Sequence, residues 1–297
     1  MILDGKVVSK ELNNTLKDQI KKTSVLFRRP KLAIILVGDN PASLKYIKGK
    51  IKAADFVGID VELIRFSKNC EEEDVIKKII SINNNKSIDG LIVQLPLPKN
   101  FNEKKITDTI GENKDADGFT TLSKGRLFQG SPKICPATPL GIIKLLDYYK
   151  INVSGKKTVV IGRSNIVGFP LAKMLLDRNA TVTICHSQTK SIKEYTKNAD
   201  LIFIAIGKPD YLTSNMVKKG VVIVDVGINV GIDGKLSGDA KFSELKDISS
   251  AITPVPGGVG PMTIHALLSN TIELYKSNVK IISVSYTHLT LPTILRV

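Results

Sequence analysis

The segment 156–187 constrains the fold of this chain more than any other, because it joins a strand, a glycine turn, a helix and a second strand within about thirty residues. Gly162 and Gly168 of "GRSNIVGFP" are the first and last glycines of a phosphate-binding turn, and Ser164 stands where a second glycine is usual. Pro170 occupies an early helical position, where the missing amide donor costs nothing. An ordinary strand-to-helix turn is the alternative. The second strand, at the expected spacing, favours a site in which backbone amides at the helix start bind a pyrophosphate.

The second strand, 181–185, bears on the choice between NAD and NADP. It is followed by His186 and Ser187 rather than by the acidic residue that accepts a hydrogen bond from the ribose in NAD sites. Arg163 in the turn and Ser187 can pair with a 2′-phosphate, which favours NADP. Arg163 as a surface cation is the alternative, and His186 taken alone is more often structural than a ligand or an acid.

Apolar runs alternate with helical patterns along the rest of the chain. The runs are continuous, as expected for parallel strands covered on both faces. Strands are predicted at 31–39, 61–66, 89–98, 199–207 and 220–229, and helices at 72–83 and 139–149. We therefore expect an α/β protein with two α/β domains, the second a Rossmann-type doubly wound dinucleotide-binding domain, and a cleft between them. The loop-rich passage 111–139 marks the boundary, which places the domains at 1–138 and 139–262.

Charge and composition limit the partners. The 297 residues include 43 Lys and Arg against 28 Asp and Glu, a formal net charge of +15. The basic residues are spread along the chain, aromatic residues make up 5% and Trp is absent, so no basic run is interleaved with stacking rings as nucleic-acid binding favours. A polyanionic cofactor suits the charge better.

Cysteine usage and hydropathy bear on the compartment. The three cysteines, 70, 135 and 185, are widely separated and form neither a CxxC pair nor a zinc spacing, so no metal is predicted and a reducing compartment fits best. No run approaches the roughly eighteen apolar residues of a membrane span, and no signal-peptide pattern opens the sequence. These features predict a cytoplasmic protein that does not bind membranes.

The segment "SLKYIKGK", 43–50, contains a candidate catalytic pair. A helix after Pro41 places most of its lysines toward water, but Tyr46 and Lys50, four residues apart, lie together at the border of the apolar stripe. An ammonium there is partly desolvated, which lowers its pKa. A snorkelling lysine beside a half-buried tyrosine is the alternative on this segment alone.

Eight motifs in order decide between these alternatives: "YIKGK", "GLIVQLPLP", "KDADGF", "CPATP", "GRSNIVG", "CHSQT", "VDVGIN" and "ITPVPGGVGPMTI". With them the chain, from Leu3 to about Tyr275, resembles the bifunctional methylenetetrahydrofolate dehydrogenase/cyclohydrolase family. The resemblance implies that NADP+ oxidises 5,10-methylenetetrahydrofolate to the methenyl form, which water then opens to 10-formyltetrahydrofolate. It also implies a place in one-carbon metabolism and purine biosynthesis, and a homodimer.

The resemblance assigns roles in folate binding and proton transfer. Lys50 is the expected base, Gln94 its hydrogen-bond partner and Tyr46 the side chain against the folate ring, and Asp117 of "KDADGF" pairs with the pterin. Ser43 is expected to line the same wall, to cap the helix, or to do both. Pro256 and Gly260 are expected to border the folate and the nicotinamide. The predicted cofactor-binding residues are Gly162, Arg163, Ser164, Val167, Gly168, His186, Ser187, Gly207, Gly227 and Ile228.

The resemblance further implies that a helix over 263–280 packs back on the first domain, where folate binds. His265 departs from the small aliphatic residue that is usual there. The end of the chain, 284–297, fits no family pattern and looks like translated adapter sequence.

Two other functions are compatible with parts of the sequence. One is another NAD(P)-dependent dehydrogenase of the same fold, acting on an amino acid or a shikimate-like substrate; "YIKGK" and "VQLPLP" count against it. The other is a non-enzymatic basic protein that binds nucleic acid or nucleotides. A salt-dependent DNA shift without NADP-dependent absorbance change would favour this second alternative.

Overall fold

The computed structural model describes residues 1–24, 28–231 and 234–287. The chain divides into two compact units, each formed by two separate segments. Unit 1 comprises Met1–Thr15 and Asp117–Leu267, and unit 2 comprises Leu16–Ala116 and Leu268–Val297. The division falls at residue 117, within the loop-rich passage, whereas the sequence places the boundary at 138.

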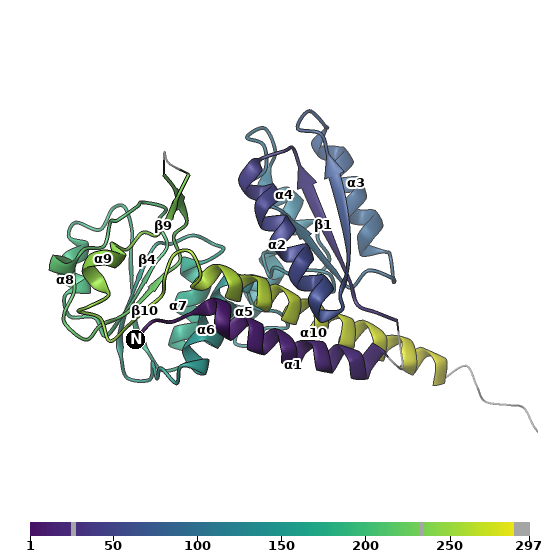
Figure 1. The fold of residues 1–297 in the computed structure, drawn as a ribbon. Helices are drawn as coiled ribbons and strands as arrows, with labels where there is room; N and C mark the ends of the chain where they lie inside the picture. Colours follow the sequence, from purple (N-terminus) through teal and green to yellow (C-terminus); the bar gives the residue numbers. More distant parts are fainter. Residues whose placement is uncertain (25–27, 232–233, 288–297) are drawn as a thin grey trace, which may run out of the picture. The chain divides into compact units, whose positions relative to one another are not determined.

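Unit 2 contains a three-stranded parallel sheet in the order β2-β1-β3 (Figure 1). Its elements are β1 (Lys31–Val37), α2 (Pro41–Val57), β2 (Asp60–Phe66), α3 (Glu72–Asn83), β3 (Gly90–Val93) and α4 (Glu103–Asp108). Both connections between parallel strands run through a helix, as parallel pairing requires. β3 is shorter than the predicted run 89–98 because the prolines at 96 and 98 cannot donate to a ladder.

The central strand β1 is buried on both faces, which explains its continuous apolar sequence. Ala33, Ile35 and Val37 pack in one cluster with apolar residues of α3 and α4. Side chains alternate along a strand, so Leu32 and Ile34 point to the other face. Unit 2 is therefore a sheet between two apolar layers.

Unit 1 contains a five-stranded parallel sheet in the order β10-β7-β6-β4-β5. Its strands are β4 (Lys157–Ile161), β5 (Thr181–Cys185), β6 (Leu201–Ile204), β7 (Val222–Asp225) and β10 (Ala251–Ile252). The chain passes from β4 to β5 on one side and then to β6 on the other. This reversal creates the topological switch point beside β4 where doubly wound sheets bind their ligands, and the predicted Rossmann-type fold is confirmed.

Several further elements complete the two units. They are α1 (Gly5–Ser24), α5 (Thr121–Phe128), α6 (Ala137–Tyr148), α7 (Gly168–Leu176), α8 (Ile192–Thr196), η1 (Ser214–Met216), the hairpin strands β8 (Asn229–Val230) and β9 (Leu236–Ser237), α9 (Phe242–Leu245) and α10 (Val259–Thr287). The passage predicted as loop thus contains α5, whose N-cap Thr120 accepts a hydrogen bond from Ser123 N. α10 begins before the expected residue 263, and 288–297 of the predicted foreign tail lie outside the described residues.

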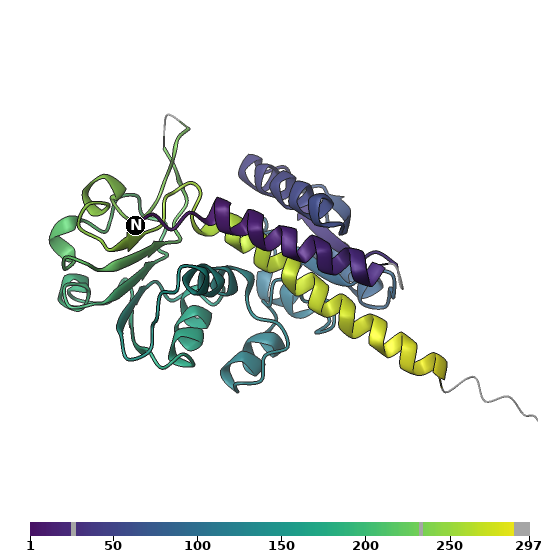
Figure 2. The same cartoon turned by 60° about the horizontal axis from the view of Figure 1, so that its bottom comes forward.

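Within unit 1, the first half of α1 lies beside the start of α10 (Figure 2). His265 on α10 is buried, and its Nδ1 lies 2.8 Å from Asn13 Oδ1 of α1. Its Nε2 lies 3.2 Å from Nζ of Lys144 on α6. The unusual histidine therefore joins three helices through a buried polar network.

Within unit 2, the second half of α10 contacts Arg28, which precedes β1, and Gly90 of β3. Tyr275 donates a hydrogen bond to Arg28 O at 2.6 Å, and Arg28 forms two bonds of 2.7 Å with the buried carboxylate of Asp89. Thr271 lies against Gly90 of β3, and a side chain at position 90 would crowd Thr271. The segment of α10 that begins at Leu268 and includes Thr271 and Tyr275 is thus part of unit 2 by packing as well as by compactness. No helix in the described ranges has both the length and the hydropathy that crossing a bilayer requires.

Candidate active site

Helix α2 carries the first group of predicted site residues. Asn40 caps it, because its Oδ1 accepts hydrogen bonds from Ala42 N at 3.0 Å and Ser43 N at 3.1 Å. Pro41 follows at the first helical position, and Gly58 ends the helix in a left-handed conformation. Ser43 is buried and is not the cap, so that alternative for Ser43 is wrong.

Lys50 differs from the other lysines of α2 by its burial. Lys50 is only 4% exposed, whereas Lys48 and Lys52 are exposed. Its Nζ donates to Gln94 Oε1 at 3.1 Å and lies 4.8 Å from the centre of the Tyr46 ring. The structure therefore brings together three residues that the sequence predicted from segments 44 residues apart.

Gln94 is held in turn by the loop that follows β3. Its side-chain Nε2 donates to Leu95 O at 2.7 Å, and its backbone N–H donates to Ile35 O at 2.8 Å. The amide oxygen is therefore left to face Lys50. A neutral acceptor orients the amine without stabilising its charge as a carboxylate would.

The other predicted folate-binding residues, Asp117, Pro256 and Gly260, belong to unit 1. Asp117 is half-buried, and its carbonyl accepts a hydrogen bond from Ala137 N at 3.2 Å. Pro256 is exposed, and a Cβ added to Gly260 would meet no atom within 4 Å. Gly260 is thus not required by internal packing.

The turn after β4 shows why its two glycines are needed. Gly162 has φ +125°, and a Cβ on Gly168 would lie 2.2 Å from Gly162 O. Ser164 occupies the turn through its hydroxyl, which accepts hydrogen bonds from Val167 N at 3.2 Å and Gly168 N at 3.4 Å. The serine in place of the second glycine therefore holds the first turn of α7.

A pocket of about 280 Å³ lies at the carboxyl ends of β4, β5 and β6. It contains four of the predicted cofactor residues: Gly162, Arg163, His186 and Ser187. Two further polar residues that the sequence did not single out, Lys208 and Tyr211, also line it. The remaining lining residues are Ile161, Ile192, Ala205 and Ile206.

The charge of this pocket fits a phosphorylated nucleotide. Arg163 and Lys208 are cationic, Ser187 offers a hydroxyl, and none of the lining residues is Asp or Glu. Ribose 2′-phosphate needs such donors and is repelled by an acid. His186 has a local role as well: its N–H donates to Thr189 Oγ1 at 2.9 Å, and its Nδ1 accepts from Gln188 N at 3.2 Å.

Gly207, Gly227 and Ile228 do not line the 280 Å³ pocket. Gly207 donates its N–H to Asp239 Oδ2 at 2.9 Å, and Gly227 packs against the Asp239 side chain. Ile228 is 57% exposed. The sequence analysis missed Asp239. The signal that could have identified it is the pair Gly238-Asp239 directly after β9.

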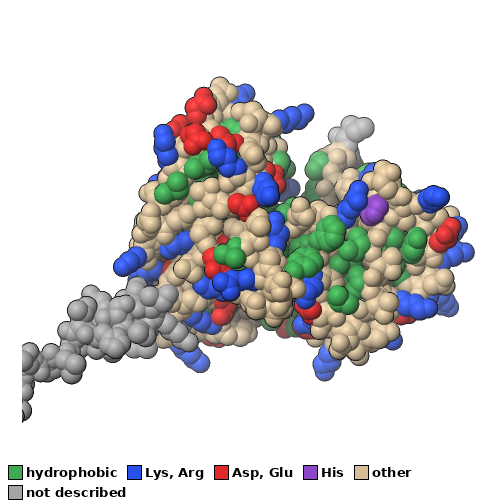
Figure 3. Space-filling model, turned by 180° about the vertical axis from the view of Figure 1, so that it is seen from behind, with side chains coloured by type: hydrophobic (Ala, Val, Ile, Leu, Met, Phe, Trp, Pro, Cys, Tyr) green, Lys and Arg blue, Asp and Glu red, His purple; other side chains and the backbone are tan. Residues whose placement is uncertain are grey.

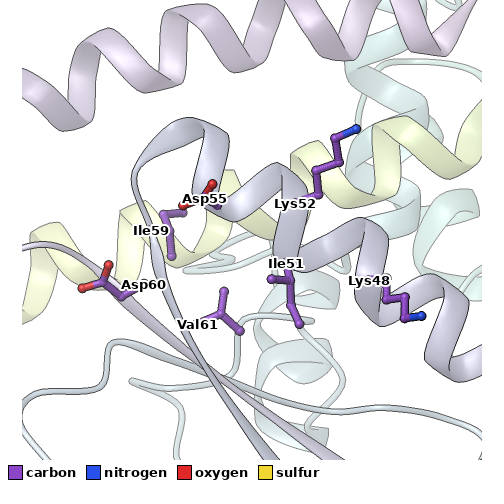
Figure 4. Close-up of a pocket in the computed structure, with 7 residues that line it drawn as sticks. All are labelled: Lys48, Ile51, Lys52, Asp55, Ile59, Asp60 and Val61. Carbon is purple, nitrogen blue, oxygen red and sulfur yellow. The ribbon is translucent and has the colours of Figure 1, made fainter.

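A second hollow, of about 510 Å³, lies between α2 and the start of β2 (Figure 4). It is lined by Lys48, Ile51, Lys52, Asp55, Ile59, Asp60 and Val61. The ammonium groups of Lys48 and Lys52 point away from its apolar side chains (Figure 4). It contains none of the predicted site residues. Within the described ranges, no three His, Cys, Asp or Glu side chains are grouped as a metal site would require.

Family comparisons match both halves of the chain. Residues 3–117 match the model of the tetrahydrofolate dehydrogenase/cyclohydrolase catalytic domain, and residues 136–279 match the NAD(P)-binding domain of the same family. The chain belongs to this family. A bifunctional protein FolD from Thermodesulfovibrio yellowstonii is 46% identical over 281 residues, which are 95% of this chain and 98% of the relative.

Solved structures extend the match to three dimensions. The bifunctional FolD of Campylobacter jejuni aligns with a TM-score of 0.91 and 45% identity, covering 93% of this chain and 99% of that one. The FolD of Trypanosoma brucei, in complex with an NADP cofactor and an inhibitor, aligns with a TM-score of 0.91 and 31% identity, covering 94% and 98%.

Proposed function

We propose that this chain oxidises 5,10-methylenetetrahydrofolate to 5,10-methenyltetrahydrofolate with NADP+ and hydrolyses the product to 10-formyltetrahydrofolate, as a bifunctional enzyme of one-carbon metabolism. The observation that carries this proposal is the buried Lys50 with a neutral amide partner and an aromatic neighbour. Membership of the family, over both of its domains, supplies the substrate class.

Lys50 acts in the ring-opening step. A methenyl folate is a cationic electrophile, so water that attacks it must lose a proton, and a neutral amine can accept that proton. Burial and a cationic substrate both favour the neutral amine. Gln94 orients the amine, and Tyr46 supports the folate ring and restricts the lysine side chain.

Arg163, Lys208 and Ser187 hold the phosphorylated end of the cofactor, and their chemistry favours NADP over NAD. The bound cofactor supplies an acceptor for the hydride that leaves the methylene carbon. Its binding set also includes Gly162, Ser164, Val167, Gly168, His186, Gly207, Gly227 and Ile228. Hydride transfer asks of the protein mainly the alignment of two rings, rather than acid or base chemistry.

The folate-binding set includes Ser43, Asp117, Pro256 and Gly260 besides the lysine site. The carboxylate of Asp117 suits the two donors of an aminopyrimidine ring. The buried Ser43 precedes Tyr46 by three residues on α2, so the two lie on the same face of the helix. The open space at Gly260 leaves room for a ligand that approaches the backbone.

A homodimer is part of the proposal. β5 ends the five-stranded sheet, and its residues Val182 and Ile184 are half-exposed. α7 packs beside β5 and α5, and these two helices expose four large apolar side chains: Leu122, Phe128, Phe169 and Leu176. An open strand edge beside apolar helix residues suits an isologous contact with a second copy.

We further propose a cytoplasmic enzyme that acts without nucleic acid or membranes and whose 10-formyl product supplies purine biosynthesis. The three cysteines are widely separated in the sequence and form no CxxC pair, which suits a reducing compartment. On the face drawn in Figure 3, basic side chains are interspersed with acidic and neutral ones, unlike the continuous basic stripe of a nucleic-acid site.

The test is an assay of purified protein with methylenetetrahydrofolate and either NADP+ or NAD+. We expect reduced nicotinamide to form faster with NADP+, and added methenyltetrahydrofolate to lose its absorbance by ring opening. A different dehydrogenase of this fold would reduce neither cofactor with this substrate. A nucleic-acid binder would instead shift DNA in a salt-dependent manner without any change in nicotinamide absorbance.

A further inference from the structure

Asp239 is a fully buried carboxylate that binds three consecutive backbone amides. Its Oδ2 accepts from Ile206 N at 2.7 Å and Gly207 N at 2.9 Å, and its Oδ1 accepts from Lys208 N at 2.8 Å. Asn229 Nδ2 adds a fourth donor to Oδ1 at 2.9 Å. Three of these four hydrogen bonds come from the loop after β6, so the buried carboxylate restricts this loop despite the conformational freedom of Gly207.

A second buried carboxylate, Asp225, holds Asp239 in place. Asp225 Oδ1 accepts from Asp239 N at 3.0 Å and from Gly227 N at 2.9 Å. Its Oδ2 accepts from Ala240 N at 2.8 Å. Asp225 is the last residue of β7, so the sheet itself anchors the backbone that carries Asp239.

Glycines make room for both carboxylates. A Cβ on Gly227 would lie 2.2 Å from Asp239 Cγ, and a Cβ on Gly238 would lie 1.9 Å from Asp225 Oδ2. No side chain fits at either position without displacing a carboxylate. The glycine of "VDVGIN" is therefore explained by Asp239.

The loop that Asp239 restrains is a wall of the nucleotide pocket. Ile206 and Lys208 both line that pocket, and Gly162 and Arg163 of the glycine turn line it as well. Each of them donates its backbone N–H to Asp239, so their side chains leave the loop in directions set by that carboxylate. A pocket wall built before the ligand arrives loses less entropy on binding.

We propose that Asp239 is a positioning residue for the nucleotide cofactor, which fixes the loop 206–208 so that Ile206 and Lys208 form a preorganised wall of the pocket. This proposal rests on the proposed NADP-dependent function. Asp239 acts through the backbone it binds and touches neither the substrate nor the reacting atoms.

The variant that tests this role is Asp239→Asn. Whichever way the new amide is turned, its NH2 faces two N–H donors, so residue 239 loses two of its four hydrogen bonds, and at least one of the lost bonds comes from the loop 206–208. We expect the KM for NADP+ to rise about tenfold, the KM for the folate to stay the same, and kcat at saturating cofactor to change by less than about twofold.

Glu244→Gln is the matched control. Glu244 on α9 also accepts a backbone N–H, from Ser214 at 3.3 Å, but neither residue lines the pocket. It should leave both KM values unchanged. An Asp239→Asn protein that is folded by circular dichroism and binds NADP+ as tightly as the wild type overturns the proposal.

A second measurement decides the matter if Asp239→Asn does not fold. Hydrogen exchange of the wild-type protein without cofactor should show the amides of residues 206–208 protected, with little further change when NADP+ is added. Rapid exchange that is slowed only by NADP+ would contradict a preformed wall. Failure of the wild type to bind NADP+ at all would refute the proposed function, and the exchange of the cofactor-free protein would still report on Asp239.

Discussion

The ammonium of Lys50 donates a hydrogen bond to the side-chain oxygen of Gln94 at 3.1 Å, and this bond joins the middle of α2 to the residue that follows β3. The lysine is buried, and its neighbours in the bond and the ring contact, Gln94 and Tyr46, are neutral. Taking a charge out of water is costly when a neutral group is the acceptor. This arrangement suits the proton-transfer role that we propose for Lys50.

Lys50→Met should abolish ring opening and leave part of the hydride transfer. Methionine keeps most of the side-chain volume but has no group that can accept a proton from water. Cyclohydrolase activity should fall at least about 100-fold, the lower end of what one positioned acid or base contributes. The two activities are measured separately, by loss of methenyl absorbance and by reduction of NADP+.

Lys48→Met is the control for this substitution, because Lys48 lies on the same helix with its side chain in water. It should leave both activities near the wild-type values. Equal loss of the two activities in Lys50→Met would assign Lys50 to substrate binding or to folding instead of proton transfer.

Gln94→Glu should shift the pH–rate profile of ring opening to higher pH. The new carboxylate favours the charged form of the adjacent amine, so the pKa of Lys50 rises and more alkaline solution is needed to obtain the neutral base. The expected shift is about one pH unit or more. The measurement is cyclohydrolase rate against pH for both proteins, and superimposable profiles would contradict the arrangement.

Arg163→Ala should reduce the preference for NADP over NAD. Loss of a charge-assisted contact to a phosphate costs about 1.5–3 kcal/mol, which corresponds to a tenfold or greater fall in the ratio of kcat/KM for the two cofactors. Arg178→Ala is the control, since Arg178 pairs with Asp147 at the surface. An unchanged ratio in Arg163→Ala would show that Arg163 is a surface cation.

His265→Leu should make the protein less sensitive to acid. Burial, with a smaller contribution from the charge of Lys144, lowers the pKa of His265 from 6.5 to about 3. Below pH 6.5 the unfolded chain takes up a proton that the folded protein does not, so the free energy of unfolding falls as pH falls toward 3. The variant should lack this loss, about 1.4 kcal/mol per pH unit.

The measurement for His265 is urea unfolding between pH 4 and 8 for both proteins. At pH 7 the variant should be less stable by about 1–3 kcal/mol, because Asn13 and Lys144 lose a partner. Asp225 acts in the opposite direction in both proteins: burial raises its pKa to about 6, so its contribution to stability is full below about pH 4 and is lost as pH rises through 6. Parallel pH curves for the two proteins would show that His265 is not the group responsible.

Several local features were predictable because their causes are local. The glycine turn was predicted from Gly162 and Gly168, since only glycine allows the conformation and the close approach found there. α1 was predictable but was overlooked: Asp4 accepts hydrogen bonds from Lys6 N and Val7 N, which marks the start of a helix.

Sequence by itself determined the order of strands β1 to β7, the glycine turn and the pair of Tyr46 and Lys50 on one helix face, because periodicity and turn chemistry act over a few residues. Tertiary structure alone decided how deeply Lys50 is buried beside Gln94, which loop Asp239 restrains, and how His265 joins three helices. Burial and hydrogen-bond partners depend on segments that are distant in the chain and meet only in the packed fold, where an unpaired polar group is too costly to keep.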